Sequence, residues 1–426
     1  MNLLYNSLPF LLIFISSARF LQLNVSMVNS KTHPDDIRVL KQLKNGFDPN
    51  SISPGSCLSS WDFSVDPCDH IFTDRFTCGF RCDLIVSGSH RLTEITLDQA
   101  GYSGSLSHVS FNLPYLQTLD LSYNSLSGSI PVSLSNLTLL HRLSLSKNSF
   151  TGSIPSSLGA LTRLQELYLD NNRLTGSIPL TFNLLVSLKR LELQQNNLSG
   201  ELPDLSQLRN LNYLDLSDNL ISGEVVEILP PSVIEISYRN NSFSGDFNVN
   251  IAELRSLQVL DLSYNELTGM IPSSLFDHPS LQQLTISHNN FTFLQAPRNM
   301  GLTSGLVAVD LSYNELHGLL PAFMAWMPKL SALSLEHNKF TGMIPPPYAM
   351  KAVVPRPGMA PFERLLLGGN YLFGPIPGQL MGLKPGSANV SLVDNCLYRC
   401  PDTLFFCQGG DQKSLVDCKT FGPIIP

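Results

Sequence analysis

The stretch LQVLDLSYNELTGMIPSSLFDHPS, from Leu257 to Ser280, determines the fold of this chain. Its first half reads LxxLxLxxN, in which Leu260 and Leu262 alternate as in a short strand with one buried face. Asn265 then turns the chain, and the second half reads LxGxIP. The unit has apolar edges that only a neighbouring copy can cover. We therefore interpret it as one coil of a stacked solenoid.

The same unit recurs along most of the chain at a spacing close to 24 residues. The turn position is held by Ala100, Asn124, Asn148, Asn172, Asn196, Asn219, Asn241, Asn265, Asn289, Asn314, Asn338, Asn370 and Asn395. An asparagine amide has donors and an acceptor, so in a buried turn it can bond backbone groups of its own and the adjacent coil. Ala100 lacks this amide, which suits an end coil that has a cap on one side. The pattern predicts about twelve to thirteen repeats joined by an asparagine ladder.

Composition and charge are those of a folded protein without a nucleic-acid partner. Hydrophobic residues make up 43% and charged residues 14% of the 426 residues, and the formal net charge is −7. A mildly acidic chain has no bulk attraction for nucleic acid, and no run of Lys or Arg supplies one locally.

The first 18 residues have the pattern of a secretory signal peptide. Residues 8–15, LPFLLIFI, form an apolar core of suitable length, and Ser16 and Ala18 are small residues before a cleavage site. We place the cleavage after residue 18, with a later position, up to about residue 26, as the alternative. The weaker alternative is an uncleaved anchor, because a span needs ~18 or more apolar residues. No later stretch is apolar enough to cross a bilayer. We therefore expect a secreted protein with no transmembrane segment of its own.

The cysteines lie in two groups that flank the repeats. The groups are Cys57, Cys68, Cys78 and Cys82, and Cys396, Cys400, Cys407 and Cys418. An even number in an exported chain predicts disulfides, which here would hold caps over the two leucine-lined ends of the solenoid. A zinc site in the second group is the less favoured alternative. Each group allows three pairings; we favour Cys68–Cys78 with Cys57–Cys82 and leave the second group open.

Residues 34–47 have the pattern of a helix that packs on the first coil. Pro34 suits a first turn, and Asp35 and Asp36 suit a helix N-terminus. The apolar residues on one face are Ile37, Leu40, Leu43 and Phe47. Trp61 is the expected packing anchor of the remaining cap.

The second half of the unit ends in Ile-Pro at six places. These are Ile130-Pro131, Ile154-Pro155, Ile178-Pro179, Ile271-Pro272, Ile344-Pro345 and Ile376-Pro377. This GxIP form resembles the plant-specific class of extracellular leucine-rich repeats, and the likeness covers roughly residues 34–418. The layout is similar to the ectodomain of a plant receptor-like protein without membrane span or kinase. It is also similar to the polygalacturonase-inhibiting proteins of the plant wall, which have Cys-rich caps at both ends.

The resemblance implies an α/β solenoid, a right-handed superhelix with a parallel β-sheet on its concave side and disulfide-bonded caps at both ends. The expected domains are a signal peptide at 1–18, an N-terminal cap at 27–91, repeats at 92–395 and a C-terminal cap at 396–426. The coil of Asn289 departs from the pattern, with Phe293 in the place of glycine. The step to Asn370 is longer because of a proline-rich insertion at 345–361. We expect this insertion to bulge from a rim as a loop, since proline does not fit regular structure easily.

Residues between and just after the inward-pointing strand leucines should face the concave groove. Just before the turn, this column reads Tyr123, Lys147, Asn171, Gln195, Asp218, Asn240, Tyr264, His288, Tyr313 and His337. Twelve steps of ~4.8 Å make the inner sheet about 58 Å long. With about 10–15 Å of exposed width, the groove offers on the order of 600–900 Å², comparable to the ~800 Å² of each partner in a standard interface.

One concave patch combines aromatic and ionisable side chains on four successive coils. It consists of Asp261, Tyr264, His288, Tyr313, Glu336 and His337. Such groups on a rigid platform are good anchors, so we interpret the patch as the candidate ligand-binding site. The alternative is that Tyr and His, in a generic LDLSYN consensus, merely cover the turn. A further hypothesis is that the two histidines sense pH.

Six sites follow the Asn-x-Ser/Thr rule for N-glycosylation. They are Asn24, Asn136, Asn197, Asn240, Asn290 and Asn389. Asn136 maps to the convex side, whereas Asn240 and Asn389 map to concave columns. Glycans at these two sites would block part of the groove and leave the segment from Asp261 to His337 open.

Enzyme signatures are absent, with no phosphate loop, HExxH, GxSxG or kinase set, and we expect no catalytic residue, metal or cofactor. Plant peptide receptors of this class often bind a free carboxylate with an Arg-x-Arg pair, which this chain lacks. We expect a non-catalytic recognition protein of the plant apoplast or cell wall. It would bind a peptide or protein in signalling or defence, with a membrane receptor kinase as partner. The alternatives are an inhibitor of a microbial polygalacturonase and a wall scaffold without a specific ligand.

Overall fold

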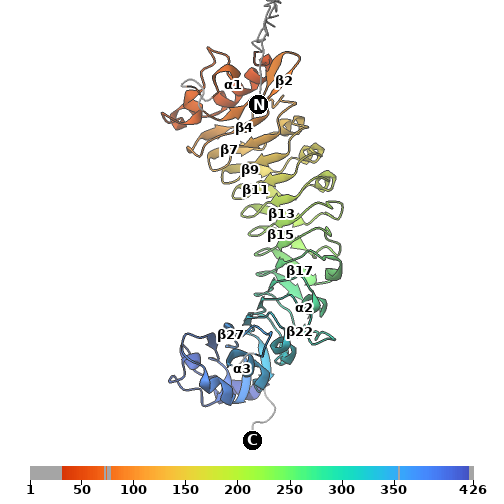
Figure 1. Ribbon diagram of the computed structural model, residues 1–426, viewed down its shortest axis with the longest axis vertical. Helices are drawn as coiled ribbons and strands as arrows, with labels where there is room; N and C mark the ends of the chain where they lie inside the picture. Colours follow the sequence, from red (N-terminus) through yellow and green to blue (C-terminus); the bar gives the residue numbers. More distant parts are fainter. Residues whose placement is uncertain (1–30, 72, 74–77, 354–355, 422–426) are drawn as a thin grey trace, which may run out of the picture.

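The structure is a computed structural model that describes residues 31–71, 73, 78–353 and 356–421. The proposed signal peptide at 1–18 and the sequon at Asn24 lie outside the described residues. The chain forms one elongated, curved solenoid, with α1 (Pro34–Gly46) near one end and α3 (Pro346–Val353) near the other (Figure 1). The predicted leucine-rich solenoid is therefore confirmed.

A 14-stranded sheet runs the length of the solenoid, and each coil contributes one short strand. In spatial order the strands are β1 (Phe80–Arg81), β4 (Glu94–Thr96), β6 (Thr118–Asp120), β8 (Arg142–Ser144), β10 (Glu166–Tyr168), β12 (Arg190–Glu192), β14 (Tyr213–Asp215), β16 (Glu235–Ser237), β18 (Val259–Asp261), β21 (Gln283–Thr285), β23 (Ala308–Asp310), β25 (Ala332–Ser334), β27 (Arg364–Leu366) and β29 (Asn389–Ser391). Only β1 is antiparallel to its neighbour, and all the other pairs are parallel. Leu260 aligns with Leu284, so leucines form continuous rows, and both are at most 1% exposed.

The second half of each coil adds a strand to a second, lateral layer. An 8-stranded sheet contains β5 (Ser103–Ser105), β7 (Ser125–Ser129), β9 (Ser149–Ser153), β11 (Arg173–Gly176), β13 (Asn197–Glu201), β15 (Leu220–Gly223), β17 (Ser242–Asp246) and β19 (Glu266–Thr268). A four-stranded sheet contains β24 (His317–Leu319), β26 (Lys339–Gly342), β28 (Tyr371–Pro375) and β30 (Cys396–Tyr398).

Between these two lateral sheets, β20 (Met270–Ile271) pairs only with β22 (Phe293–Leu294). This break falls where the sequence departs from the glycine pattern. Gly269 in the preceding coil has a φ of +78°, and Phe293 has no positive φ because a bulky side chain disfavours that region.

The convex side is formed by short helices, most of which follow a proline turn. The 3₁₀ helices are η4 (Val132–Asn136), η5 (Ser156–Ala160), η6 (Leu180–Leu184), η7 (Ile251–Glu253), η8 (Ala322–Trp326) and η9 (Gly378–Gly382), and one α-helical turn, α2 (Ser274–Asp277), replaces them in one coil. Each of η4, η5 and η6 begins directly after a proline. Leu134, Leu158 and Phe182 are fully buried in these helices.

The proline-rich insertion was wrongly predicted to be a loop, because it contains helix α3. Pro346 and Pro347 occupy the first turn, where the missing N–H groups cost nothing, and good helix formers follow them. Tyr348 is fully buried, and its hydroxyl donates to the Pro321 carbonyl at 3.0 Å. The helix packs against η8 and η9, so the insertion extends the convex layer.

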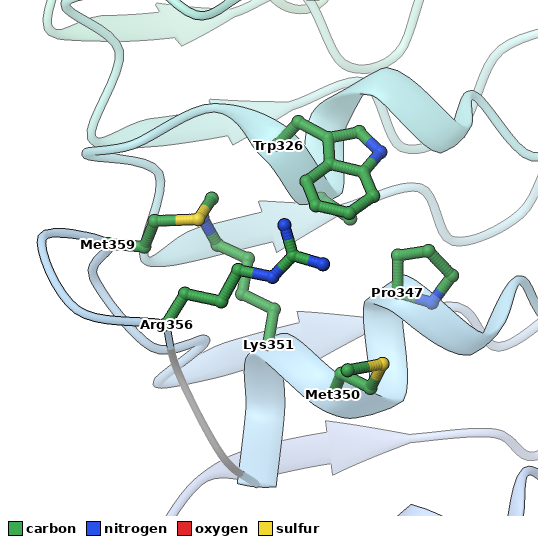
Figure 2. A pocket seen from close by; sticks show the side chains of 7 residues that line it. Trp326, Pro347, Met350, Lys351, Arg356 and Met359 are labelled. Carbon is green, nitrogen blue, oxygen red and sulfur yellow. The ribbon is translucent and has the colours of Figure 1, made fainter.

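A buried lysine lies on this helix. Lys351 is 4% exposed, and its ammonium donates to the Met327 carbonyl at 2.5 Å and lies 5.1 Å from the ring centre of Phe362. Burial lowers the pKa of Lys351 to about 8. Next to it, the Arg356 guanidinium lies 4.3 Å from the ring centre of Trp326 (Figure 2).

The turn asparagines bond neighbouring coils to each other. Asn265 illustrates the pattern: its Oδ1 accepts the Phe243 N–H at 3.0 Å. Its Nδ2 donates to the Tyr238 carbonyl of the previous coil at 3.0 Å and to two carbonyls of its own turn. The same four bonds recur at Asn370 and Asn395, which are both 0% exposed.

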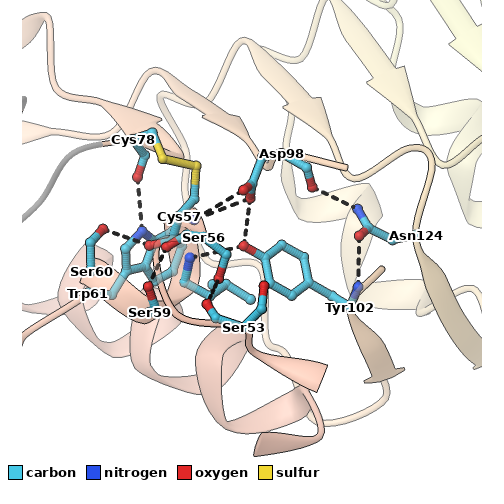
Figure 3. Close-up of a disulfide and its surroundings, with 11 residues drawn as sticks. Ser53, Ser56, Cys57, Ser59, Ser60, Trp61, Cys78, Asp98, Tyr102 and Asn124 are labelled. Carbon is cyan, nitrogen blue, oxygen red and sulfur yellow. Dashed lines mark hydrogen bonds between the residues drawn. A yellow bond between two sulfur atoms is a disulfide. The ribbon is translucent and has the colours of Figure 1, made fainter. Parts of the chain in front are cut away.

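The N-terminal cap contains α1 and two disulfides. The short elements around them are η1 (Pro49–Ser51), η2 (Cys57–Ser60), η3 (Cys68–His70), β2 (Leu84–Val86) and β3 (Ser89–Arg91). The predicted helix at 34–47 is confirmed to within one residue. Trp61 is 2% exposed, as expected, and its indole N–H donates to the Cys78 carbonyl at 3.0 Å (Figure 3).

The disulfide pairing favoured from the sequence is wrong at this end. The bonds join Cys57 to Cys78 and Cys68 to Cys82. The Trp61–Cys78 hydrogen bond brings the chain back onto η2, so that Cys78 lies beside Cys57. This tertiary contact cannot be inferred from the spacing of the cysteines in the sequence.

A buried ion pair ties α1 to the first coil. The Arg91 guanidinium donates to the Asp36 carboxylate at 2.7 and 3.1 Å, and the Leu92 N–H donates to the same carboxylate at 2.8 Å. Asp36 is 1% and Arg91 7% exposed. The helix-pattern argument assigned Asp36 only to the helix N-terminus and missed this role.

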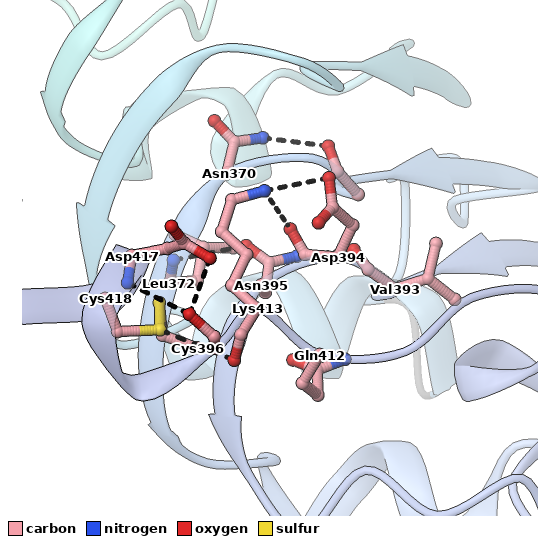
Figure 4. Close-up of polar contacts among 12 residues, drawn as sticks. Asn370, Leu372, Val393, Asp394, Asn395, Cys396, Gln412, Lys413, Asp417 and Cys418 are labelled. Atoms are coloured by element: carbon pink, nitrogen blue, oxygen red, sulfur yellow. Dashed lines mark hydrogen bonds and ion pairs between the residues drawn. A yellow bond between two sulfur atoms is a disulfide. The ribbon is translucent and has the colours of Figure 1, made fainter.

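In the C-terminal cap, the side-chain amide of Gln412 takes the place of the next asparagine in the asparagine ladder. One disulfide joins Cys396 to Cys418 and holds α4 (Leu415–Phe421) against the last coil (Figure 4). A second joins Cys400 to Cys407, at the end of η10 (Phe405–Cys407). Gln412 accepts the Leu397 N–H at 3.0 Å and donates to the Leu392 carbonyl at 3.1 Å. These are the contacts that the asparagine of a following coil would make.

Candidate ligand-binding site

The residue before each turn asparagine has a left-handed backbone conformation that points its side chain out of the solenoid. Tyr264, His288, Tyr313 and His337 have φ values of 51–56°. Tyr264 and Tyr313 are 42% and 46% exposed. Their backbone N–H groups bond the next coil, as for Tyr264 to the Ser287 carbonyl at 2.9 Å. The turn therefore fixes the direction of these side chains, and different residue types occupy this position in different coils.

These four side chains form a continuous ring stack, which we call the aromatic ladder. The centroids of Tyr264 and His288 are 4.0 Å apart, those of His288 and Tyr313 4.2 Å, and those of Tyr313 and His337 4.3 Å. The angles between successive planes are 13°, 9° and 21°. The coil spacing of ~4.8 Å is close to a ring-stacking distance, so planar side chains on consecutive coils lie face to face.

Arg239 lies at one end of the aromatic ladder and Gly369 at the other. The Arg239 guanidinium lies 5.1 Å from the ring centre of Tyr264 and extends the stack by a cation–π contact. At the other end, His337 covers Gly369, where an added Cβ would lie 2.5 Å from His337 Nδ1. Glycine at this position therefore lets the last ring lie flat.

Three carboxylates of the concave side, Asp261, Asp310 and Glu336, lie on the coils of the aromatic ladder. Asp261 accepts the Ser263 N–H at 2.9 Å and its hydroxyl at 2.6 Å, and Asp310 binds Ser312 in the same way at 3.0 and 2.6 Å. Burial raises the pKa of Glu336, although a hydrogen bond from Ser391 opposes the shift. Within the described part of the chain, no Lys, Arg or His lies within 4.0 Å of these carboxylates.

The N-terminal part of the concave sheet is different, because three of its acids form ion pairs with arginines of the same sheet. Arg142 pairs with Glu166 at 2.5 Å and with Asp120 at 3.5 Å, and Arg190 pairs with Glu192. The two guanidinium groups also lie over the rings of Tyr168 and Tyr213, at 4.5 and 4.4 Å. In this segment, Asp120, Glu166 and Glu192 therefore have ion-pair partners, whereas Asp215, which accepts from Ser217, has none among the described residues.

The electrostatics of the aromatic ladder favour neutral imidazole at His288. Burial between the two tyrosine rings lowers the pKa of His288, and the charges of Arg239 and His337 lower it further. The Asp310 carboxylate opposes this shift.

The described sequon asparagines are all exposed. Asn136 lies on η4 of the convex side, and Asn197 and Asn290 follow turn asparagines at the lateral layer. Asn240 lies one coil before Tyr264 on the concave column, where its amide donates to Asp218 at 2.7 Å. Asn389 begins β29, two coils beyond His337. The two concave sequons thus flank the aromatic ladder.

The sequence identified the six residues of the patch by column but did not predict the ring stacking or the role of Arg239. Arg239 lies one position before the column residue Asn240. The signal for Arg239 in the sequence is the run of planar and cationic side chains on consecutive turns.

Comparison with known proteins identifies the family. A leucine-rich-repeat region matches residues 95–346, more than half of the chain, and a leucine-rich-repeat N-terminal domain matches residues 33–73. The chain belongs to the leucine-rich-repeat family. Helix α1 and the first two cysteines of this leucine-rich-repeat protein fall within the N-terminal match.

Curated relatives are receptor-like proteins of Arabidopsis thaliana. Receptor-like protein 49 is 33% identical over 96 residues, which are 22% of this chain and 11% of that protein. Receptor-like protein 35 is 37% identical over 91 residues, or 20% of this chain and 9% of that protein. The match thus spans about a tenth of these relatives.

Solved plant ectodomains share the fold. The receptor kinase GASSHO1/SCHENGEN3 of Arabidopsis thaliana, in complex with CASPARIAN STRIP INTEGRITY FACTOR 2, has a TM-score of 0.63 and 31% identity, over 75% of this chain and 40% of that one. The plant peptide hormone receptor RGFR1, in complex with RGF2, has a TM-score of 0.59 and 31% identity, over 74% and 48% of the two chains.

The described residues contain neither a membrane-spanning helix nor a cluster of metal-ligating side chains. No helix there has both the length and the apolar character required to cross a lipid bilayer. In that same part of the chain, His, Cys, Asp and Glu form no group of three or more that could hold a metal ion.

Proposed function

We propose that this leucine-rich-repeat protein is a secreted, non-catalytic recognition protein that binds a peptide or protein on the aromatic ladder. It would act in the plant apoplast or cell wall, in signalling or defence, together with a membrane receptor kinase. The observation that carries the proposal is the stack of four rings in register on a rigid sheet. Rigid aromatic side chains supply contact area at a low cost in conformational entropy.

The acidic side chains beside the aromatic ladder favour a ligand with a basic side chain. Among the described residues, Asp261, Asp310 and Glu336 lie beside the aromatic ladder without an ion-pair partner, whereas Asp120, Glu166 and Glu192 on the N-terminal coils have one. A ligand with a basic side chain would supply the missing partner and could also stack on the tyrosine faces. The lack of an Arg-x-Arg pair likewise argues against recognition of a free carboxylate.

The solved neighbours support a peptide or protein ligand. GASSHO1/SCHENGEN3 and RGFR1 were both determined with a bound factor or hormone, and each shares 31% identity with this chain. Sugars on Asn240 and Asn389 would restrict access to both sides of the aromatic ladder, which leaves that segment as the open part of the groove.

The test is a crosslinked pulldown from plant cell-surface extracts with two matched triple variants. One is Tyr264→Ala/His288→Ala/Tyr313→Ala in the aromatic ladder. The control is Asn171→Ala/Gln195→Ala/Asp218→Ala, which changes the same column on other coils. Partners recovered by wild type and the control but lost with the ladder variant support the proposal. Equal recovery by both variants contradicts it.

The second candidate is an inhibitor of a microbial polygalacturonase, which the two-capped layout favours. An inhibition assay against fungal polygalacturonases separates the two functions. Inhibition that persists in the ladder variant would assign the protein to this class and place the contact elsewhere.

A further inference from the structure

A small pocket in the convex layer, away from the aromatic ladder, is lined by two cationic side chains. It has a volume of about 20 Å³, and residues of η8, of α3 and of the segment after α3 line it. The two cations are Lys351 and Arg356. The apolar residues that line it are Ala325, Trp326, Pro347, Met350 and Met359 (Figure 2).

The ammonium group of Lys351 is buried without a negative partner. Lys351 is 4% exposed, and among the described residues no carboxylate lies within 4.0 Å of its ammonium. An ammonium has three N–H donors, and the Met327 carbonyl accepts one of them at 2.5 Å. The ring of Phe362 compensates the charge in part, at 5.1 Å from its centre. Because an unpaired buried charge is costly, a negative group at this pocket would be stabilising.

The guanidinium group of Arg356 is the second cation, and an aromatic ring fixes its orientation. It lies 4.3 Å from the ring centre of Trp326 (Figure 2). In the part of the chain that the structure describes, it too has no carboxylate within 4.0 Å. Stacking on the face of a ring leaves the N–H groups at the edge of a guanidinium available for a planar acceptor.

The size of the pocket favours a carboxylate over larger anions. A volume of about 20 Å³ exceeds the ~10–15 Å³ that one water-sized group requires. A carboxylate can place one oxygen in this space and the other on the edge of the guanidinium. A tetrahedral phosphate or sulfate is bulkier and would leave most of its oxygens outside. A water molecule would fill the space but would not neutralise the two positive charges.

The pocket is accessible from solvent, and its rim is apolar. Met350 is 40% exposed, and Arg356 is exposed as well. A carboxylate can therefore enter from water, and the carbon chain that carries it can pack on Met350 and Pro347. This packing removes apolar surface from water and adds to the affinity.

We propose that the pocket of Lys351, Arg356 and Trp326 binds the carboxylate group of a small organic acid or of an acidic peptide side chain. Lys351 and Arg356 hold the two oxygens, and the apolar rim contacts the adjoining carbon chain. The inference is independent of the ligand site proposed on the concave face, because the two sites share no residue.

An NMR titration of the full chain with sodium acetate tests the pocket, and the two tryptophans provide an internal control. Trp326 lines the pocket, whereas Trp61 is buried in the N-terminal cap. The indole N–H signal of Trp326 should shift with saturation, and that of Trp61 should not shift. Lys351→Met should abolish the saturable shift, and Arg356→Gln should weaken acetate binding by about tenfold or more. The matched control, Lys329→Met, removes an exposed lysine outside the pocket and should leave the affinity unchanged.

Two further probes distinguish the source of the carboxylate. Sodium butyrate represents a free organic acid, and the capped peptide acetyl-Ala-Asp-Ala-amide carries its carboxylate on a side chain. Tighter binding of butyrate assigns the pocket to a free acid, and tighter binding of the peptide assigns it to an acidic peptide segment.

Three results would overturn the proposal. One is the absence of a saturable shift at Trp326 with acetate, butyrate and the peptide. Another is binding of sodium chloride or sodium phosphate as tight as that of acetate, which would show that the pocket does not select a carboxylate. The third is an equal loss of affinity in Lys351→Met and Lys329→Met while circular dichroism shows an intact fold.

Discussion

The imidazole of His288 lies parallel to the phenol ring of Tyr313, with centroids 4.2 Å apart and 9° between the planes. The two residues are 25 positions apart in sequence, and each precedes the turn asparagine of its coil. Their stacking is a product of the solenoid repeat, since the left-handed turn fixes the direction of each ring and the sheet fixes the spacing. This relationship leads to the first two predictions.

Tyr313→Ala should destabilise the protein by about 1–3 kcal/mol, because it removes two stacked pairs of ~0.5–1.5 kcal/mol each. Tyr123→Ala is the control: Tyr123 is equally exposed at 46%, but its partner in the column is Lys147, at 4.3 Å from the ring centre. Denaturant unfolding should show the smaller loss for Tyr123→Ala. Equal losses would mean that ring stacking contributes nothing beyond burial.

Asp310→Asn should lower the pKa of His288 further, because it removes the carboxylate that opposes the effect of burial. The folded pKa of His288 lies below its ordinary value of 6.5. Its contribution to stability is therefore fully present above pH 6.5 and is lost as the pH falls through the folded pKa. An NMR titration of the His288 ring measures its pKa in the wild-type protein and in Asp310→Asn. A pKa that rises in Asp310→Asn would contradict this account of the site.

Asn370→Ala should destabilise the protein by several kcal/mol. The change leaves the Phe340 N–H without its acceptor and the Leu335 carbonyl without its donor, and each unsatisfied buried group costs ~1–3 kcal/mol. Asn148 makes the same kinds of bond but is only partly buried, so Asn148→Ala should cost less. Thermal unfolding followed by circular dichroism compares the stability of the two variants. A larger loss of stability in Asn148→Ala than in Asn370→Ala would show that burial of the asparagine does not determine the free-energy cost.

Asp36→Asn should destabilise the N-terminal cap by roughly 3–5 kcal/mol, because Arg91 would remain buried without a counter-charge. Asp35→Asn, which affects the exposed pair with Arg38 at 2.7 Å, should cost less than about 1 kcal/mol. Hydrogen exchange of α1 and the first coil measures the local effect. Similar exchange rates in the two variants would refute the structural role of Asp36.

Lys351→Met should stabilise the protein at pH 7 by up to about 3 kcal/mol, the free energy that corresponds to a pKa lowered from 10.5 to about 8. The folded pKa is depressed, so the stability linked to Lys351 is fully present above pH 10.5 and is lost as the pH falls through about 8. The advantage of the variant should therefore shrink between pH 8 and pH 10. A constant difference across this range in denaturant unfolding would disprove the assignment.

Much of the fold followed from local pattern. The period near 24, the alternating leucines and the glycine and proline positions predicted the coils, and the pattern of 34–47 predicted α1. The insertion at 345–361 was mispredicted, because a propensity argument about proline ignored its tolerance in a first helical turn and the apolar surface of η8 and η9 on which the helix packs.

The sequence by itself determined the solenoid, its two cysteine-containing ends and the column of the aromatic ladder, because a repeated unit places equivalent residues at equivalent positions. Tertiary structure alone decided the pairing of Cys57 with Cys78, the burial of Asp36 against Arg91 and the use of Gln412 as the last amide of the asparagine ladder. These contacts lie in the caps, where no period relates one residue to the next. There, the partner of each side chain depends on how the chain folds back on itself.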